Sequence, residues 1–186
     1  MSCLIDLFHG DKSKGACGIP TTGGTESIII SVLTHREYYC KKKGIKKPNM
    51  VCSRTVHGAF DKACFYLGVE MRKVDLKKVG EFYETDINGM KNHIDSNTIM
   101  MVGSSPDYGF GMVDNMEALG KIALRYDIGL HSDTCLGSLL YPFSEEAGFK
   151  PPFVTDFRVE GVTAVSCDPH KYGYGPKGNS VVLFRT

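Results

Sequence analysis

The chain has 186 residues, which is enough for one sizeable core, and we expect residues 1–186 to form one domain. Its formal net charge of +1 argues against a strong electrostatic attraction to nucleic acid, and no stretch approaches the ~18–20 apolar residues that a membrane span needs. The seven cysteines are scattered and odd in number, which favours reduced thiols in a cytoplasmic protein over a disulfide framework or a structural zinc site.

Helical and strand-like segments alternate along the chain. We expect four helices, over residues 25–43, 58–67, 86–95 and 114–126. Six strands are expected, over residues 49–53, 69–74, 97–103, 128–133, 162–167 and 179–185. Gly44 and Gly68 are typical helix stop signals, and Asp114 is a candidate N-cap. This alternation with short connections predicts an α/β fold, with a mainly parallel sheet flanked by helices.

The most informative residue is Lys171, which follows the apolar run 162–165 and lies in a loop of small residues. Ligands of parallel sheets bind beyond the carboxyl ends of the strands, where this loop is expected. A lysine placed there is a candidate Schiff-base nucleophile, provided that desolvation lowers the pKa of its amine. The alternative is an ordinary solvated loop lysine.

Two further segments would complete a cofactor site with this lysine. Asp133 ends the strand-like run 128–133, and a carboxylate there can keep a pyridine nitrogen protonated, so that the ring accepts electrons. Gly23 and Gly24 precede a helix whose first N–H groups suit a phosphate, and the Thr25 hydroxyl adds a donor. A lysine, an acid and a glycine turn before a helix are the parts that hold pyridoxal phosphate. The alternatives are a turn-capping aspartate and an ordinary helix start with Thr25 as its cap.

Three more side chains are candidates for the same site. His57 begins a helix after a strand, where its ring could stack on a flat cofactor or have no ligand at all. His170 adjoins Lys171 and is near enough to touch the cofactor phosphate or the reacting centre. Lys177 could bind an anionic group of the substrate, or be a surface lysine.

Competing motifs are weaker. The spacing Gly173-x-Gly175-x-x-Gly178 fits a dinucleotide fingerprint, but a strand rather than a helix is expected after it. The chain has neither a G-x-x-x-x-G-K-[ST] phosphate loop nor the G-x-S-x-G elbow of a serine hydrolase. The basic run at residues 41–47 is typical of a solvated helix C-terminus.

Five signatures of the chain together resemble the sphingosine-1-phosphate lyases, a family within the wider pyridoxal-phosphate group that includes glutamate and aromatic amino-acid decarboxylases. These signatures are TGGTES at 22–27, HGAFDKA at 57–63, HSDTCLG at 131–137, DFRVEGVT at 156–163 and HKYGYGPKG at 170–178. The resemblance covers nearly all 186 residues. It implies the large domain of the aspartate aminotransferase-like architecture (fold type I), truncated at both ends, so that the chain is the central part of a larger protein.

The resemblance also implies residue roles. Lys171 would hold the cofactor, Asp133 would pair with its pyridine nitrogen and His57 would stack on its ring. Three residues would serve the cofactor phosphate: Gly24, Thr25 and His170. The implied catalytic set is Lys171, Asp133, His57 and His170. The implied substrate-binding residues are Lys177, for the substrate phosphate, and Tyr174.

The activity implied is cleavage of a phosphorylated long-chain amino alcohol, of the sphingosine 1-phosphate type, to a long-chain aldehyde and ethanolamine phosphate. The base that takes the hydroxyl proton stays open between Lys171, His170 and the cofactor phosphate. The alternatives are an amino-acid decarboxylase and a cofactor-free remnant that acts only by binding. The resemblance further implies a homodimer when intact, and an endoplasmic reticulum location if a longer form carries the family's membrane anchor.

Two positions depart from the pattern of that family. Thr134 follows the aspartate where alanine is usual, on the side expected to pack against the other face of the ring. Asp107 stands where glutamine is usual, and we expect it to place an extra negative charge near the site.

Overall fold

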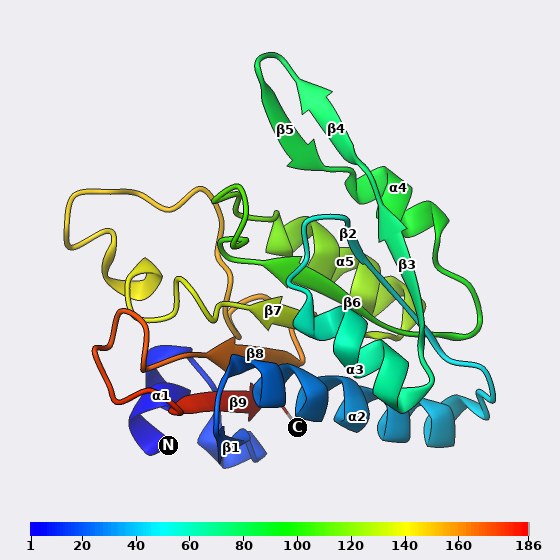
Figure 1. Cartoon of the computed structure of the whole chain (residues 1–186), viewed down its shortest axis with the longest axis horizontal. Coiled ribbons are helices and arrows are strands. Elements are labelled where there is room, and N and C mark those ends of the chain that lie inside the picture. Colours follow the sequence, from blue (N-terminus) through cyan, green and yellow to red (C-terminus); the bar gives the residue numbers. More distant parts are fainter. Residues whose placement is uncertain (186) are drawn as a thin grey trace.

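A seven-stranded sheet forms the centre of the molecule (Figure 1). The computed structural model describes residues 1–185. Across the sheet the strand order is β1-β9-β8-β7-β6-β2-β3. The bounds are β1 Cys17–Thr21, β2 Asn49–Ser53, β3 Glu70–Val74, β6 Thr98–Ser104, β7 Gly129–Asp133, β8 Ala164–Cys167 and β9 Ser180–Phe184. The pairings from β3 to β8 are parallel, and β9 pairs antiparallel with β8 and β1, which confirms the predicted mainly parallel sheet.

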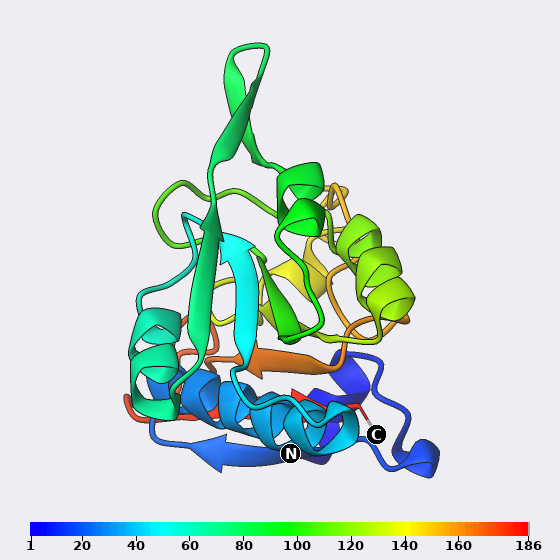
Figure 2. The same cartoon turned by 90° about the vertical axis from the view of Figure 1, so that its right-hand side faces the viewer.

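Helices cover both faces of this sheet (Figure 2). One face carries α2 (Gly24–Lys43) and α3 (Ala59–Leu67), and the other carries α1 (Ser2–Leu7), α4 (Ile87–Asn92) and α5 (Met116–Tyr126). Successive strand residues point to opposite faces. On β2, therefore, Met50 and Cys52 pack with α2 and α3, whereas Val51 packs with α4 and α5. The two hydrophobic clusters fix the sheet between its helices, and the predicted fold class is confirmed.

Helix α5 begins two residues later than predicted, and Asp114 is not its N-cap. The side chain of Asn115 caps the helix by accepting a hydrogen bond from the Ala118 N–H at 2.9 Å. The buried Asp114 carboxylate instead accepts from the Thr85 hydroxyl at 2.6 Å and from the Ser104 N–H at 2.8 Å. Asp114 therefore joins the end of β6 to β5 rather than starting the helix.

Several elements are absent from the sequence-based prediction. These are α1, the edge strand β1, and a hairpin of β4 (Leu76–Val79) and β5 (Phe82–Thr85) that projects from the body of the molecule in both views (Figures 1 and 2). Strand β1 contains Gly18 and Pro20, residues that argue against a strand except at a sheet edge. The hairpin packs little core, because only Thr85 of its eight strand residues is buried.

The cysteines and the helices bear on two expectations from composition. All seven cysteines, which lie within the described residues, are free thiols. Between residues 1 and 185, we find no helix that combines the length and the apolar character that a bilayer crossing needs.

Candidate active site

The carboxyl ends of β7 and β8 meet the start of α2 at a cavity of about 410 Å³. Its lining consists of Thr22, Gly23, Gly24, Thr25, Glu26, Ile28, His57, Asp133, Cys135, Asp168, His170 and Lys171. The cavity thus brings together all six residues predicted to hold the cofactor, namely Gly24, Thr25, His57, Asp133, His170 and Lys171. They come from four separate parts of the chain, and the parallel sheet places them at one edge.

Lys171 forms an ion pair that the sequence analysis did not predict. Its Nζ lies 2.9 Å from Oδ2 of Asp168, whose side chain is only 2% exposed. Burial lowers the pKa of Lys171, but the hydrogen bond and charge of Asp168 outweigh it, and the net pKa is raised above its ordinary 10.5. Desolvation therefore acts in the expected direction, but the net pKa is raised rather than lowered, because the buried Asp168 carboxylate holds the ammonium ion.

Asp168 also joins this ion pair to the start of α2. The Ser180 hydroxyl donates to Asp168 Oδ1 at 2.5 Å, and Ser180 Oγ lies 2.8 Å from Ser27 Oγ on α2. A Cβ on Gly24 would lie 2.7 Å from Asp168 Oδ2, so this position requires glycine for the helix to approach the carboxylate. The sequence signal for Asp168 was its place three residues before Lys171 in a short loop after β8.

The first turn of α2 presents backbone donors to the cavity. Its N-cap is Gly23, which has no side chain to cap the helix, and Thr25 is the second helical residue rather than the cap. The Gly23 carbonyl accepts from the N–H groups of Glu26 and Ser27. The N–H groups of Gly24 and Thr25 precede these and belong to residues that line the cavity, where the helix dipole favours an anion.

Asp133 ends β7 and shares the cavity with Lys171. Its side chain is held from behind, because Oδ1 accepts from the Ser166 hydroxyl and the Cys135 N–H, both at 3.1 Å. The neighbouring Thr134 is 1% exposed and donates its hydroxyl to the Ser166 carbonyl at 2.5 Å. The Thr134 hydroxyl is therefore hydrogen-bonded to the backbone of β8.

The two histidines of the cavity are held by backbone donors. His57 Nδ1 accepts from the Ala59 N–H at 3.1 Å, and its ring meets the Tyr108 ring edge-on, with centroids 6.3 Å apart. His170 Nδ1 accepts from the Asn179 N–H at 3.3 Å, and its Nε2 lies 3.7 Å from Asp168 Oδ2. In both rings Nδ1 is therefore an acceptor, which leaves Nε2 as the protonated nitrogen.

The predicted substrate-binding residues lie elsewhere. Tyr174 is 90% exposed with a left-handed φ of 53°, and Lys177 is exposed. Of the residues that the structure describes, neither belongs to the cavity lining. Asp107 is also outside this lining, and its buried carboxylate accepts through Oδ1 from the Phe110 N–H of its own loop at 2.8 Å.

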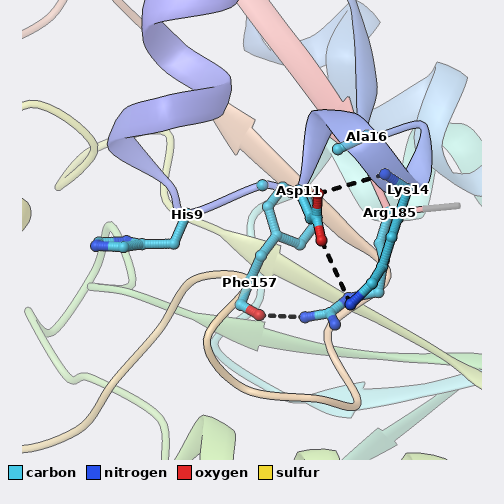
Figure 3. Close-up of a pocket in the computed structure, with 7 residues that line it drawn as sticks. His9, Asp11, Lys14, Ala16, Phe157 and Arg185 are labelled. Atoms are coloured by element: carbon cyan, nitrogen blue, oxygen red, sulfur yellow. Dashed lines mark hydrogen bonds and ion pairs between the residues drawn. The ribbon is translucent and has the colours of Figure 1, made fainter.

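A second, smaller cavity of about 100 Å³ lies beside the N-terminal segment (Figure 3). Its polar groups already have partners within the protein. Arg185 donates to the carbonyls of Phe157 and Val159, and Asp11 pairs with Lys14 at 3.3 Å. It contains none of the residues predicted to be functional, and we assign it a structural role.

Two buried histidines, His35 on α2 and His131 on β7, predict an acid-sensitive fold. Burial lowers the pKa of His35 and of His131 from 6.5 to about 4, against the opposing hydrogen bond of Ser31 to His35 and the charge of Asp133 near His131. Between these values the unfolded chain binds more protons, so the free energy of unfolding should fall as the pH drops from 6.5 to 4. The slope approaches about 1.4 kcal/mol per pH unit for each imidazole.

Urea unfolding at half-unit pH steps measures this slope. The variant His35→Gln should reduce it, because one of the two buried titrations is lost. His93→Gln, at the exposed C-cap of α4, is the matched control and should keep the wild-type slope. Equal slopes in all three proteins would contradict the prediction.

Comparison with known proteins agrees with this geometry. The pyridoxal-dependent decarboxylase conserved domain matches residues 1–186. The chain is 43% identical to the sphingosine-1-phosphate lyase of Saccharomyces cerevisiae over 100% of its own length and 49% identical to that of Oryza sativa subsp. japonica over 94%. A solved structure of sphingosine-1-phosphate lyase from Burkholderia pseudomallei superposes with a TM-score of 0.93 at 37% identity, covering 99% of this chain and 43% of that one.

These similarities confirm the resemblance drawn from the five signatures. The chain spans about a third of the length of the curated relatives, 31% of the yeast lyase and 32% of the rice lyase. The domain match indicates a pyridoxal phosphate cofactor, as the lysine, acid and glycine turn predicted. Matched over its whole length by that domain, the chain belongs to the pyridoxal-dependent decarboxylase family.

Proposed function

We propose that this chain provides the cofactor-binding centre of a carbon–carbon lyase that cleaves a phosphorylated sphingoid base to a long-chain aldehyde and ethanolamine phosphate. One observation carries the proposal. Lys171, Asp133, His57 and the start of α2 line a single cavity in a chain that is 43–49% identical to sphingosine-1-phosphate lyases.

The residues of the cavity fit pyridoxal phosphate. The uncapped first turn of α2 offers N–H donors for a phosphate. Gly24 lets this turn approach the loop of Lys171 and Asp168 closely, since any side chain there would meet Asp168. A primary amine and a buried carboxylate, Lys171 and Asp133, suit the aldehyde and the pyridine nitrogen of the cofactor.

We assign each side chain a task in the reaction. When bound, pyridoxal phosphate supplies a ring that accepts the electrons released as the carbon–carbon bond breaks. Asp133 would keep a proton at the pyridine nitrogen, and His57 would lie against the ring face. Gly24 and Thr25 would bind the phosphate through their N–H groups. Lys171, once its amine is free, can take the substrate's hydroxyl proton, whereas His170 carries its proton on Nε2 and can only donate there.

Lys171 must lose a proton before its amine can act as a nucleophile. Asp168, at 2.9 Å from Nζ, opposes that loss and stores the side chain as an ammonium ion. The proton that Lys171 releases can pass to this buried carboxylate, which also lies 3.7 Å from His170 Nε2. Asp168 thus controls the charge state of Lys171.

Substrate choice, assembly and location are further parts of the proposal. Lys177 and Tyr174 project from the loop that follows Lys171 and are accessible, so they can meet a substrate phosphate that approaches from outside the cavity. We propose that the complete protein is a homodimer. We also propose that it is cytoplasmic, or bound to the endoplasmic reticulum where a longer form carries an anchor.

Product analysis tests the proposal. The chain is incubated with pyridoxal phosphate and either sphingosine 1-phosphate or an aromatic amino acid, and products are identified by mass spectrometry. We expect a long-chain aldehyde and ethanolamine phosphate from the first substrate and no carbon dioxide from the second. Decarboxylation of the amino acid with an intact sphingoid phosphate would instead identify an amino-acid decarboxylase.

A further inference from the structure

A chain of buried hydrogen bonds runs from helix α2 to the Asp133 carboxylate. Ser31 Oγ lies 2.7 Å from His131 Nδ1, His131 Nε2 lies 3.0 Å from Ser166 Oγ, and Ser166 donates to Asp133 Oδ1 at 3.1 Å. Ser31, His131 and Ser166 have no exposed surface. We call these three residues the Asp133 donor chain.

Regular secondary structure brings the donor chain together. His131 and Asp133 are two residues apart on β7 and therefore point to the same face of the sheet. Ser166 is the register partner of Asp133 on the neighbouring strand β8. Ser31 lies on the buried side of α2, and Phe60 of α3 meets the His131 ring edge-on at 5.6 Å. The imidazole is thus held on several sides.

The hydrogen-bonding capacity of each group fixes which atom donates in every bond of the Asp133 donor chain. An ionised carboxylate only accepts, so the Ser166 proton points to Asp133. Ser166 must then accept from His131, which puts the imidazole proton on Nε2. The unprotonated Nδ1 accepts from Ser31. All three protons therefore point toward the charge on Asp133, an arrangement that strengthens each bond by polarisation.

A second histidine anchors the far end of the chain. His35 Nδ1 lies 2.7 Å from the Ser31 carbonyl, which can only accept, so His35 carries its proton on Nδ1. Its Nε2 then accepts from the Thr163 hydroxyl at 2.8 Å. Burial lowers the pKa of both imidazoles to about 4, so each is neutral at neutral pH and keeps one tautomer.

We infer that His131 and Ser166 are positioning residues for the reaction, because their aligned donors hold the Asp133 carboxylate in an orientation that aims it at the pyridine nitrogen of the cofactor. The inference rests on the proposed function for the role of Asp133. Both hydrogen bonds that the described residues make to this carboxylate go to Oδ1, which leaves Oδ2 for the cofactor.

The tautomers provide a test that needs no cofactor. Nitrogen-15 NMR of the histidine-labelled chain at pH 7 should show His131 protonated on Nε2 and His35 on Nδ1. In Ser166→Ala the signals of His131 should shift, whereas those of His35 should stay. A His131 ring protonated on Nδ1 would overturn the inference, since the donor chain would then point away from Asp133.

Cofactor binding provides the second test. Ser166→Ala should weaken the binding of pyridoxal phosphate about tenfold, the effect of losing one hydrogen bond to a charged group. With nitrogen-15-labelled pyridoxal phosphate, the pyridine signal should move toward that of the unprotonated ring. His131→Gln, which keeps an N–H able to reach Ser166, should lose less affinity than His131→Leu.

Ser132→Ala is the matched control. Ser132 lies on β7 between His131 and Asp133, is equally buried and donates one hydrogen bond, to the Thr155 carbonyl on the opposite face. It should bind pyridoxal phosphate as wild type does. Equal losses in Ser132→Ala and Ser166→Ala, or none in either, would overturn the inference. A wild-type chain that binds no pyridoxal phosphate refutes the proposed function instead, and the tautomers then decide the inference alone.

Discussion

Lys171→Ala is expected to abolish covalent attachment of pyridoxal phosphate to this chain. Among residues 1–185, Lys171 is the one lysine in the cavity lining, so no other amine of that lining can replace it. The wild-type chain, incubated with pyridoxal phosphate and reduced with borohydride, should gain one cofactor mass on the peptide that contains Lys171. The variant should gain none there and should lose the absorbance band of the lysine-bound cofactor.

Lys150→Ala is the control for non-specific reaction, because Lys150 is exposed and lies outside the cavity. It should retain full labelling at Lys171. A wild-type chain labelled evenly over its surface lysines, or a Lys171→Ala chain that keeps the band, would refute the assignment of Lys171. Circular dichroism of the variant shows whether loss of the amine, rather than loss of the fold, explains the result.

The residues that line the cavity could be predicted from the sequence because each stands at a point where chain direction changes. Asp133 ends a strand-like run, Lys171 follows an apolar run, and Gly24 opens a long helix. In a parallel sheet such points meet at one edge, and the cavity lining shows that they do here. The sheet itself followed from the alternation of helical and strand-like segments.

The residues behind the site could not be predicted in this way. Asp168 contacts Lys171 through the turn that follows β8, and Ser31 reaches His131 across 100 positions of sequence. A polar residue on the buried side of a helix carries no signal of its partner. The role of Asp114 was also predicted wrongly, because the sequence does not show its partner. That partner, Thr85, lies in a hairpin with few buried residues and little alternation.

For the loop after Lys171, the sequence does not predict where the side chains point. Its motif, HKYGYGPKG, is rich in glycine, and Tyr174 adopts a left-handed backbone there. Such a loop has no periodicity from which side-chain directions follow. Similarity to the lyases implied substrate contacts for Lys177 and Tyr174, and the structure leaves both exposed. Their contacts with a substrate remain a prediction.

Asp168→Asn is expected to release Lys171 from its ion pair and to shift attachment of the cofactor to lower pH. The substitution keeps the size of the side chain but removes the charge that raises the pKa of Lys171. Burial, the largest single effect on this pKa, is then opposed only by the smaller charge effects of Cys135 and Asp133, so the pKa falls and more of the amine is unprotonated at neutral pH. The rate of borohydride-trapped attachment, measured from pH 6 to 10, should reach half its maximum at a lower pH than in the wild type.

The same substitution should destabilise the cofactor-free fold by about 2 kcal/mol at pH 7. This loss of stability is smaller than the cost of leaving a fully buried charge without its partner, because the Lys171 side chain is 30% exposed. The pH dependence of this stabilisation follows from the raised pKa of Lys171. The ion pair stabilises the fold fully below pH 10.5, the ordinary value for lysine, and this stabilisation is lost as the pH rises through the higher folded-state pKa. The difference between wild type and variant should therefore narrow in alkaline solution.

Asp11→Asn is the matched control, since it removes a carboxylate from the exposed Asp11–Lys14 pair. It should leave both the pH midpoint of attachment and the urea midpoint unchanged. A double-mutant cycle with Lys171→Met then isolates the pair itself. If Asp168→Asn destabilises the Lys171→Met chain as much as the wild type, its effect comes from Ser180 and the start of α2, and Asp168 does not act as the counter-ion of Lys171.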